Sequence, residues 1–180
     1  MNIWHDISPK RVTRELFTAV IEIPKGSKVK YELDKETGFL RMDRILYTST
    51  HYPANYGFIP RTYAEDGDPL DVLVLCSEPI NSLALVNCYP IGVISMLDNG
   101  AKDDKIIAIP FDDPTYNTYT DISELPQHIF EEMSHFFSIY KQLEGKETVI
   151  DEIQHRNTAL EIIDRCIERY IQYFCKAKRS

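Results

Sequence analysis

The side chains best suited to chemistry lie in one short acidic segment. Residues 66–71 read Asp-Gly-Asp-Pro-Leu-Asp, which places the three carboxylates of Asp66, Asp68 and Asp71 within six positions. The glycine and proline between them favour a loop, and the apolar run 72–75 that follows is typical of a buried strand. Ionised carboxylates held this close repel one another, and a divalent cation relieves that repulsion. Oxygen-only ligands favour Mg²⁺, Mn²⁺ or Ca²⁺.

Two other interpretations of this segment have to be weighed. Asp, Gly and Pro are all common turn formers, so a solvated acidic turn stays open from this segment alone. A helix–loop–helix calcium loop also opens with Asp-x-Asp, but it requires glycine at its sixth position and glutamate at its twelfth. This chain has Asp71 and Ser77 there. The calcium loop is therefore excluded, and the acidic turn remains the alternative.

A second acidic run lies further along the chain, between two apolar stretches. It contains Asp98 and Asp103, and if a strand begins near Asp103, then Asp103 and Lys105 share one face of it. A surface hairpin is the alternative for this run. Three charged residues of earlier alternating runs either line a site with these groups or face solvent on half-buried strands: Glu22, Lys30 and Glu32.

The order of these motifs is more informative than any one of them. Residues 28–32 read Lys-Val-Lys-Tyr-Glu, Asp-Arg follows at 43–44, and Tyr-Pro-Ala-Asn-Tyr-Gly at 52–57 precedes the acidic segment 66–71. This arrangement resembles the soluble family I inorganic pyrophosphatases, in particular the short bacterial type. The resemblance extends over residues 15–141.

The resemblance implies a role for each matching residue. Four carboxylates resemble metal ligands: Asp66, Asp71, Asp98 and Asp103. Six side chains resemble the phosphate-binding set: Lys30, Arg44, Tyr56, Lys105, Tyr140 and Lys141. Asp68 resembles the carboxylate that accepts the proton of the attacking water. Three further residues resemble groups that line the site: Glu22, Glu32 and Tyr52.

The implied activity is that of a Mg²⁺-dependent inorganic diphosphatase, a hydrolase that acts on a phosphoric anhydride. Pyrophosphate would be hydrolysed to two orthophosphates by a metal-activated water, with several Mg²⁺ ions per site and Mn²⁺ as a substitute. A general base such as Asp68 contributes roughly 10²–10⁴-fold. Lysine and arginine place positive charge where the leaving phosphate gains negative charge. A metal phosphohydrolase that acts on nucleotides or phosphomonoesters remains the alternative activity.

The elements that carry these residues are expected to be strands in the first two-thirds of the chain. Runs 16–23 and 28–33 alternate in the manner of half-buried strands. Further strand-like runs are separated mostly by segments with Pro or Gly: 39–47, 56–59, 71–76, 84–88, 91–96 and 105–110. This pattern is typical of a small antiparallel barrel or sandwich.

The last third changes to helical spacing. Pro126 stands where a helix would start, and an apolar stripe follows: Ile129, Met133, Phe136, Phe137, Tyr140 and Leu143. Thr158 and Glu161 form a capping-box pattern ahead of a second stripe. We expect both helices to cover the strands within one domain, residues 1–180. With the resemblance, the fold class is α+β: a small closed antiparallel β-barrel, OB-like with a five-stranded core, and two main helices packed on it.

Composition limits the partners. With 28 acidic and 20 basic residues the net charge is −8, which repels nucleic acid and anionic membranes, so neither is expected. An oligonucleotide-binding barrel is the competing binding function, and the carboxylates oppose it. The beginning of the sequence lacks a basic region followed by an apolar run, which favours the cytoplasm. The four cysteines lack C-x-x-C spacing and are expected to be buried thiols. The resemblance implies a homo-hexamer.

Two stretches depart from the family pattern. Residues 144–152 match poorly, and the second helix ends in a basic tail at 176–179. We expect neither stretch to touch the presumed site. The tail is interpreted as a solvated helix end whose cations complement the helix dipole.

Overall fold

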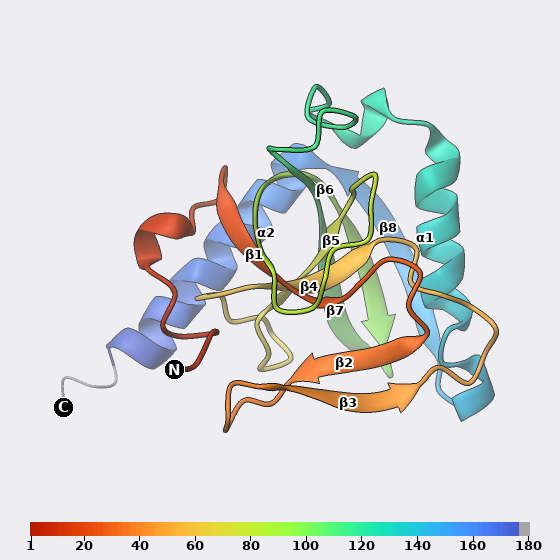
Figure 1. Ribbon diagram of the computed structural model, residues 1–180, viewed down its shortest axis with the longest axis horizontal. Helices are drawn as coiled ribbons and strands as arrows, with labels where there is room; N and C mark the ends of the chain where they lie inside the picture. The colour runs from red at the N-terminus through yellow and green to blue at the C-terminus, as the bar shows by residue number, and fades with distance from the viewer. Residues whose placement is uncertain (177–180) are drawn as a thin grey trace.

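Five strands form a closed ring at the centre of the computed structural model, which describes residues 1–176 (Figure 1). In spatial order the ring runs through β1 (Phe17–Ile23), β4 (Asn55–Ile59), β5 (Leu70–Val74), β7 (Ala101–Pro110) and β6 (Leu85–Asp98). The start of β6 pairs with β1 and closes the ring. Every residue of β1 and β4 is buried, because these strands are covered on both faces.

Three further strands lie outside the ring. β8 (Thr148–His155) pairs with the second half of β6, on the edge that β1 leaves free. β2 (Val29–Leu33) and β3 (Leu40–Ile45) form a separate antiparallel hairpin beside the ring (Figure 1). The hairpin thus stands as a wall next to the strands that carry the acidic residues.

The five-stranded core and the α+β class confirm the prediction, with two differences in detail. The pairing of β5 with β7 is parallel, because β7 turns back along β6 and so runs in the same direction as β5. The runs 84–88 and 91–96 belong to one strand, β6, which continues past Pro90 through a register shift between Pro90 and Gly92. A bulge tolerates proline, which has no N–H to donate to the ladder.

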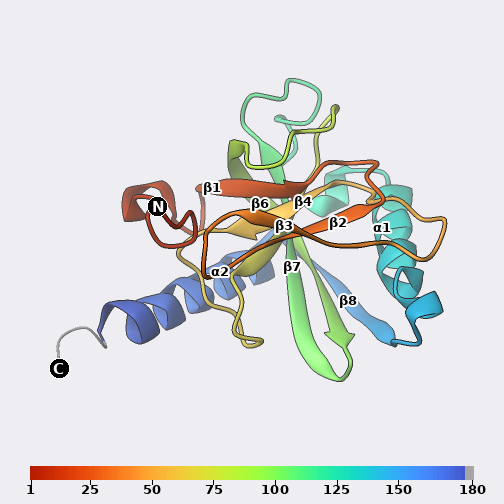
Figure 2. The ribbon, with the colours of Figure 1, turned by 60° about the horizontal axis from the view of Figure 1, so that its bottom comes forward.

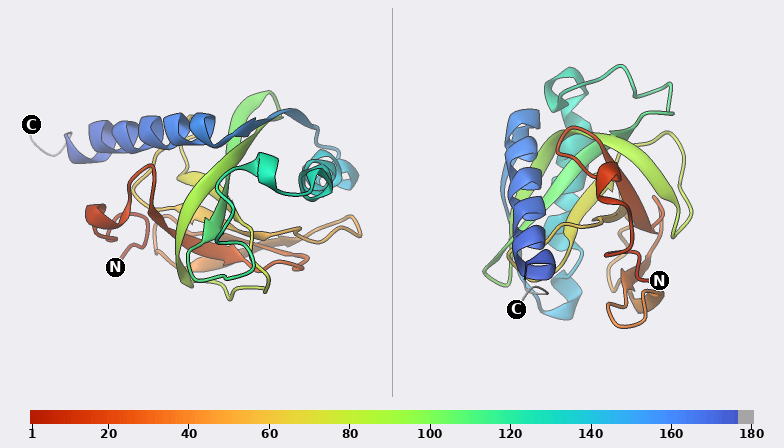
Figure 3. Two further views of the ribbon diagram at one scale, coloured as in Figure 1. Left: turned by 90° about the horizontal axis from the view of Figure 1, so that it is seen from above. Right: turned by 90° about the vertical axis from the view of Figure 1, so that its left-hand side faces the viewer.

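Two helices cover different sides of the ring (Figures 2 and 3). α1 (Gln127–Ile139) buries Phe130, Met133, Phe136 and Phe137 in one hydrophobic cluster, and α2 (Arg156–Tyr170) contributes Ala159, Ile162, Ile163 and Cys166 to another. Short turns complete the chain: η1 (Pro9–Arg11), η2 (Ile122–Glu124), η3 (Gln142–Glu144) and a π turn, η4 (Ile171–Cys175). Within residues 1–176 no helix is long and apolar enough to cross a membrane.

Several local predictions were wrong. α2 begins at Arg156, ahead of Thr158, and its first N–H is accepted at 3.0 Å by Asp121, a residue far away in the sequence. Leu143 is exposed, because α1 ends before it. Cys175 is exposed and Cys76 half-buried, whereas Cys88 and Cys166 are buried as expected. Residues 177–180, with most of the basic tail, lie outside the described residues.

Candidate active site

A cleft of about 460 Å³ opens between the hairpin, the ring and the segment after α1. Its walls come from β1, from the β2–β3 hairpin, from β4, β5, β6 and β7, from the loop before β5, and from residues 140–141. Most of the predicted site residues line it: Glu22, Lys30, Glu32, Tyr56, Asp68, Asp71, Asp98, Asp103, Lys105, Tyr140 and Lys141. Residues that are far apart in the sequence therefore meet in one place.

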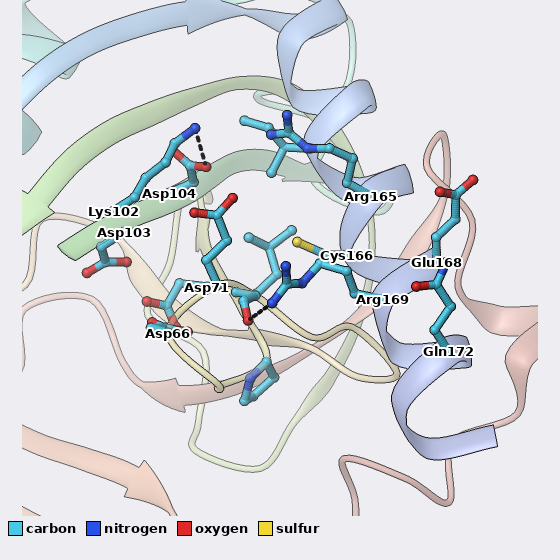
Figure 4. A pocket seen from close by; sticks show the side chains of 15 residues that line it. Asp66, Asp71, Lys102, Asp103, Asp104, Arg165, Cys166, Glu168, Arg169 and Gln172 are labelled. Atoms are coloured by element: carbon cyan, nitrogen blue, oxygen red, sulfur yellow. Dashed lines mark hydrogen bonds and ion pairs between the residues drawn. The ribbon is translucent and has the colours of Figure 1, made fainter. Parts of the chain in front are cut away.

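Three predicted residues lie outside the lining of this cleft. Asp66 lines an adjoining pocket of about 270 Å³ that shares Asp71 and Asp103 with the cleft and is bounded on its other side by α2 (Figure 4). Tyr52 is buried behind the cleft, with its ring centroid 5.5 Å from that of Tyr56. Arg44 forms ion pairs with two carboxylates beside the cleft, Asp43 and Glu144.

Lys105 stands at the centre of the cleft floor and is only 2% exposed. Its Nζ donates to Asp71 Oδ2 at 2.9 Å, to both oxygens of Asp103 at 3.1 Å and to the Tyr56 hydroxyl at 2.9 Å. Tyr56 in turn donates to Asp71 Oδ2 at 2.6 Å. Burial opposes the charge of Lys105, but Asp103 and Asp71 outweigh it and raise the pKa of this ammonium.

Strand register explains why these groups converge. Asp71 of β5 lies opposite Lys105 of the parallel strand β7, and Phe58 of β4 lies opposite Asp71 on its other side. Asp103 precedes Lys105 by two positions and therefore points to the same face of β7. The predicted shared face of Asp103 and Lys105 is confirmed by their contact.

Burial raises the pKa of several carboxylates in this region. Burial, reinforced by the charge of Asp71, raises the pKa of Glu22 to about 8, although Leu33 N donates to its carboxylate at 2.8 Å. Burial likewise raises the pKa of Asp66 to about 6, with Asp71 and Asp68 adding repulsion. The pKa of Asp103 is also raised, because burial outweighs the attraction of Lys105. A cation placed among these groups would favour their ionised forms.

The donor set fits a hard divalent cation in its chemistry. Asp66, Asp71 and Asp103 offer oxygen ligands only, the type that Mg²⁺ and Mn²⁺ prefer. The side chains of Asp71 and Asp103 pair with the ammonium of Lys105, and within residues 1–176 no three acidic, histidine or cysteine side chains converge in a ready metal geometry.

Ion pairs order the walls of the cleft. Lys30 Nζ lies 3.2 Å from Glu32 Oε2 and 3.1 Å from Asp43 Oδ2 on the hairpin. Across the cleft, Lys141 pairs with Asp98. Each of these lysines is thus held by carboxylates of the cleft region.

The sequence interpretation assigned no role to four residues that pair with the expected set. Lys35 pairs with Asp68, Arg41 with Glu32, Asp43 with Lys30 and Arg44, and Glu144 with Arg44. For Arg41 and Glu32 the hairpin register was a usable signal, since they lie directly opposite each other. For Lys35 and Glu144 the sequence held no signal, because their partners are distant in the chain. Glu144 also corrects the expectation that segment 144–152 does not touch the site.

The fold and the cleft together define a class: a small β-ring protein whose cleft brings clustered carboxylates and lysine ammonium groups together, a combination suited to a divalent cation and a phosphate-type anion. Comparison with known proteins makes this specific. The family model described as inorganic pyrophosphatase matches residues 19–171. The chain belongs to the inorganic pyrophosphatase family.

Individual relatives cover almost the whole chain. Soluble inorganic pyrophosphatase 2 of Chlamydomonas reinhardtii is 49% identical over 97% of this chain and 91% of its own length. The solved inorganic pyrophosphatase of Thermus thermophilus is 37% identical, with a TM-score of 0.86 over 94% of this chain and 99% of that one. The Helicobacter pylori enzyme is 41% identical, with a TM-score of 0.84 over 87% of this chain and 94% of that one.

Proposed function

We propose that the protein is a Mg²⁺-dependent inorganic diphosphatase that hydrolyses pyrophosphate to two orthophosphates. The observation that carries this proposal is the cleft floor, where a buried lysine, a tyrosine hydroxyl and two aspartates share one hydrogen-bond network. The proposal is supported by the names of the relatives, which are inorganic pyrophosphatases.

The cations of the cleft are proposed to hold the substrate. Lys30, Lys105 and Lys141 line it from three sides, and each ammonium can neutralise phosphate oxygens as a point charge. Arg44 can bind two oxygens at once. Tyr56 and Tyr140, both buried, donate hydrogen bonds without adding charge. Positive charge held around the bridging and leaving oxygens stabilises the charge that develops there.

Asp68 is proposed as the general base. It is half-exposed on the loop at the mouth of the cleft, paired with Lys35, and its backbone N–H donates to Asp66 Oδ1 at 3.0 Å. Lys35 keeps a positive charge beside this carboxylate. Glu22, Glu32 and Tyr52 are proposed to support the site from its lining or from behind it.

The metal ligands are proposed to be Asp66, Asp71, Asp98 and Asp103. Mg²⁺ bound by these carboxylates would supply Lewis acidity toward phosphate oxygens and would lower the pKa of a coordinated water. The side chains themselves contribute negative charge at fixed positions and exclude other anions from the ligand sites. Mn²⁺, which shares this preference for oxygen ligands, is the proposed substitute.

We further propose that residues 1–180 form one domain, that the protein acts in the cytoplasm, and that it assembles as a homo-hexamer. Light scattering or sedimentation of purified protein tests the assembly, and a monomer would overturn that part. The net charge of −8 supports the absence of nucleic-acid partners.

A substrate panel tests the proposed reaction against other metal phosphohydrolases. Purified protein is incubated with Mg²⁺ and equal concentrations of pyrophosphate, ATP or a phosphomonoester, and released phosphate is measured. We expect pyrophosphate to be preferred by at least about tenfold in kcat/KM, which corresponds to 1.4 kcal/mol of discrimination. Equal or faster release from ATP or the monoester would assign the cleft to another phosphohydrolase reaction.

A further inference from the structure

One ion pair joins the β2–β3 hairpin on one side of the cleft to the segment after α1 on the other. Arg44 Nε of β3 lies 2.7 Å from Glu144 Oε1, and Glu144 belongs to the short turn η3 that follows α1. The side chains of Arg44 and Glu144 are 18% and 7% exposed, so the pair is largely shielded from water. A shielded pair is stronger and more costly to break than one on the surface.

Each partner stands beside residues that line the cleft. Arg44 lies directly opposite Lys30 in the β2–β3 hairpin, so both side chains occupy one face. On the other wall, Glu144 N donates to Lys141 O at 3.0 Å, and Lys141 lines the cleft next to Tyr140. The ion pair therefore holds the β2–β3 hairpin, which carries Lys30, against the segment after α1, which carries Lys141.

The guanidinium of Arg44 has donor capacity to spare. It pairs with Asp43 through Nη1, but among the described residues Nη2 has no hydrogen-bond partner, and Nε contacts Glu144 Oε1 as an ion pair without forming a hydrogen bond. Glu144 Oε2 is likewise buried without a hydrogen-bond partner within residues 1–176. Buried donors left unsatisfied are unfavourable, and a phosphate oxygen at the cleft edge would satisfy those of Arg44.

We propose that Glu144 is a positioning residue for substrate binding: its carboxylate fixes Arg44 at the edge of the cleft and clamps the hairpin to the Tyr140–Lys141 wall. This inference rests on the proposed function, in which Arg44 binds a phosphate group. Asp43 cannot replace Glu144 in this role, because it also pairs with Lys30 and lies on the same hairpin as Arg44. Only Glu144 ties Arg44 to the opposite wall within the described residues.

The test compares Glu144→Gln and Glu144→Asp with a matched control, Glu147→Gln. Glu147 is exposed three positions away, and its side chain makes no ion pair within residues 1–176. We expect Glu144→Gln to raise KM for pyrophosphate roughly tenfold, less than the hundredfold that a misplacement of 1 Å can cost, with kcat changed less than about threefold. Glu144→Asp, which keeps the carboxylate, should lie between wild type and Gln, and the control should match wild type.

A second measurement is independent of turnover. Calorimetric binding of methylenediphosphonate, whose P–C–P link resists hydrolysis, is expected to weaken in Glu144→Gln by the same factor as KM rises. In an Arg44→Gln background, Glu144→Gln should change KM and diphosphonate affinity by less than about a further twofold, because both substitutions remove the same ion pair. A structural role alone would lower the melting temperature and leave KM and diphosphonate affinity unchanged.

The outcomes separate the two proposals. Wild-type KM and affinity in a folded Glu144→Gln protein, or effects that multiply fully in the Arg44→Gln background, would overturn the positioning role. If wild type binds the diphosphonate but hydrolyses no pyrophosphate, the proposed function fails, and the affinities still decide the role of Glu144. A wild type that binds no diphosphonate overturns both. Glu144→Asp keeps the test valid if the glutamine variant does not fold.

Discussion

At the scale of single residues, the cleft depends on pairs of opposite charge. Lys105 is buried with Asp71 and Asp103, and Lys141 with Asp98. The acidic motifs in the sequence pointed to the aspartates, and the alternation of residues 103–105 placed Lys105 on one face with Asp103, whereas Lys141 was named only by the family resemblance. The partners Lys35 and Glu144 were not predictable, because a long-range ion pair depends on where two loops meet in space. Arg44 was named as a candidate from the sequence, but its ion pair with Glu144 is visible only in the structure.

Asp68 allows a prediction about catalysis. Because it is half-exposed on a loop, Asp68→Asn is expected to leave folding and Mg²⁺ affinity nearly unchanged and to reduce kcat at least about a hundredfold, the lower bound for loss of a general base. Steady-state kinetics at saturating Mg²⁺ and calorimetric Mg²⁺ binding check this. Asp112→Asn, at an exposed aspartate that does not line the cleft, is the control. Near-normal turnover in a metal-loaded Asp68→Asn protein would remove Asp68 from this role.

At the scale of elements, the period of the sequence predicted most strands and both helices. It failed where tertiary contacts replace local signals. β8 carries the acidic run at residues 151–152 on an exposed face and owes its conformation to pairing with β6. The start of α2 is set by Asp121, which caps it from across the fold, so the local Thr158 pattern misled.

The Asp121 cap leads to a prediction about pH and stability. Burial opposes ionisation of Asp121, but hydrogen bonds from Arg156 N and the His155 side chain outweigh it and lower its pKa. Because the folded-state pKa is the lower one, this stabilisation is complete above about pH 4 and is lost as the pH falls through the folded-state pKa. Asp121→Ala is expected to lower the free energy of unfolding by about 1–2 kcal/mol at pH 7.

Urea unfolding at pH 7 and at pH 3 measures that effect. The difference between wild type and Asp121→Ala should shrink at the lower pH, whereas Asp112→Ala, which lies on the surface, should differ little from wild type at either. A difference that is constant or grows toward pH 3 would show that Asp121 does not act through its ionised carboxylate.

Gly57 allows a second prediction at this scale. A Cβ added there would lie 1.9 Å from Val20 O, a backbone atom of the neighbouring strand β1. Gly57→Ala must therefore push β1 and β4 apart, and we expect it to destabilise the fold by about 3 kcal/mol. Gly145 has open space around it but a φ of +69°, so Gly145→Ala is expected to lower the free energy of unfolding by only about 1 kcal/mol. Equal losses in chemical unfolding would mean that the close approach of β1 and β4 is not what demands glycine.

At the scale of the whole molecule, the protein has a net charge of −8 and its proposed substrate is also an anion. A cation bound at the site is therefore expected to be needed for binding. If Mg²⁺ binds the folded carboxylates alone, it stabilises the native state by mass action, by about 2.7 kcal/mol at a hundred times its Kd. For a chain of this size that is a rise of roughly 5–10 °C in Tm. Scanning calorimetry with Mg²⁺ and with EDTA measures it, and Asp71→Asn should reduce the rise. Identical Tm values for wild type in both conditions would contradict the metal site.

The central claim is metal-dependent hydrolysis of pyrophosphate in this cleft. Its most direct test is the initial rate of phosphate release from pyrophosphate by purified wild-type protein, measured once with millimolar Mg²⁺ and once with excess EDTA. The account predicts rapid release with Mg²⁺ and release near the uncatalysed rate with EDTA. Absence of release with Mg²⁺, from protein shown to be folded and to bind the metal, would contradict it.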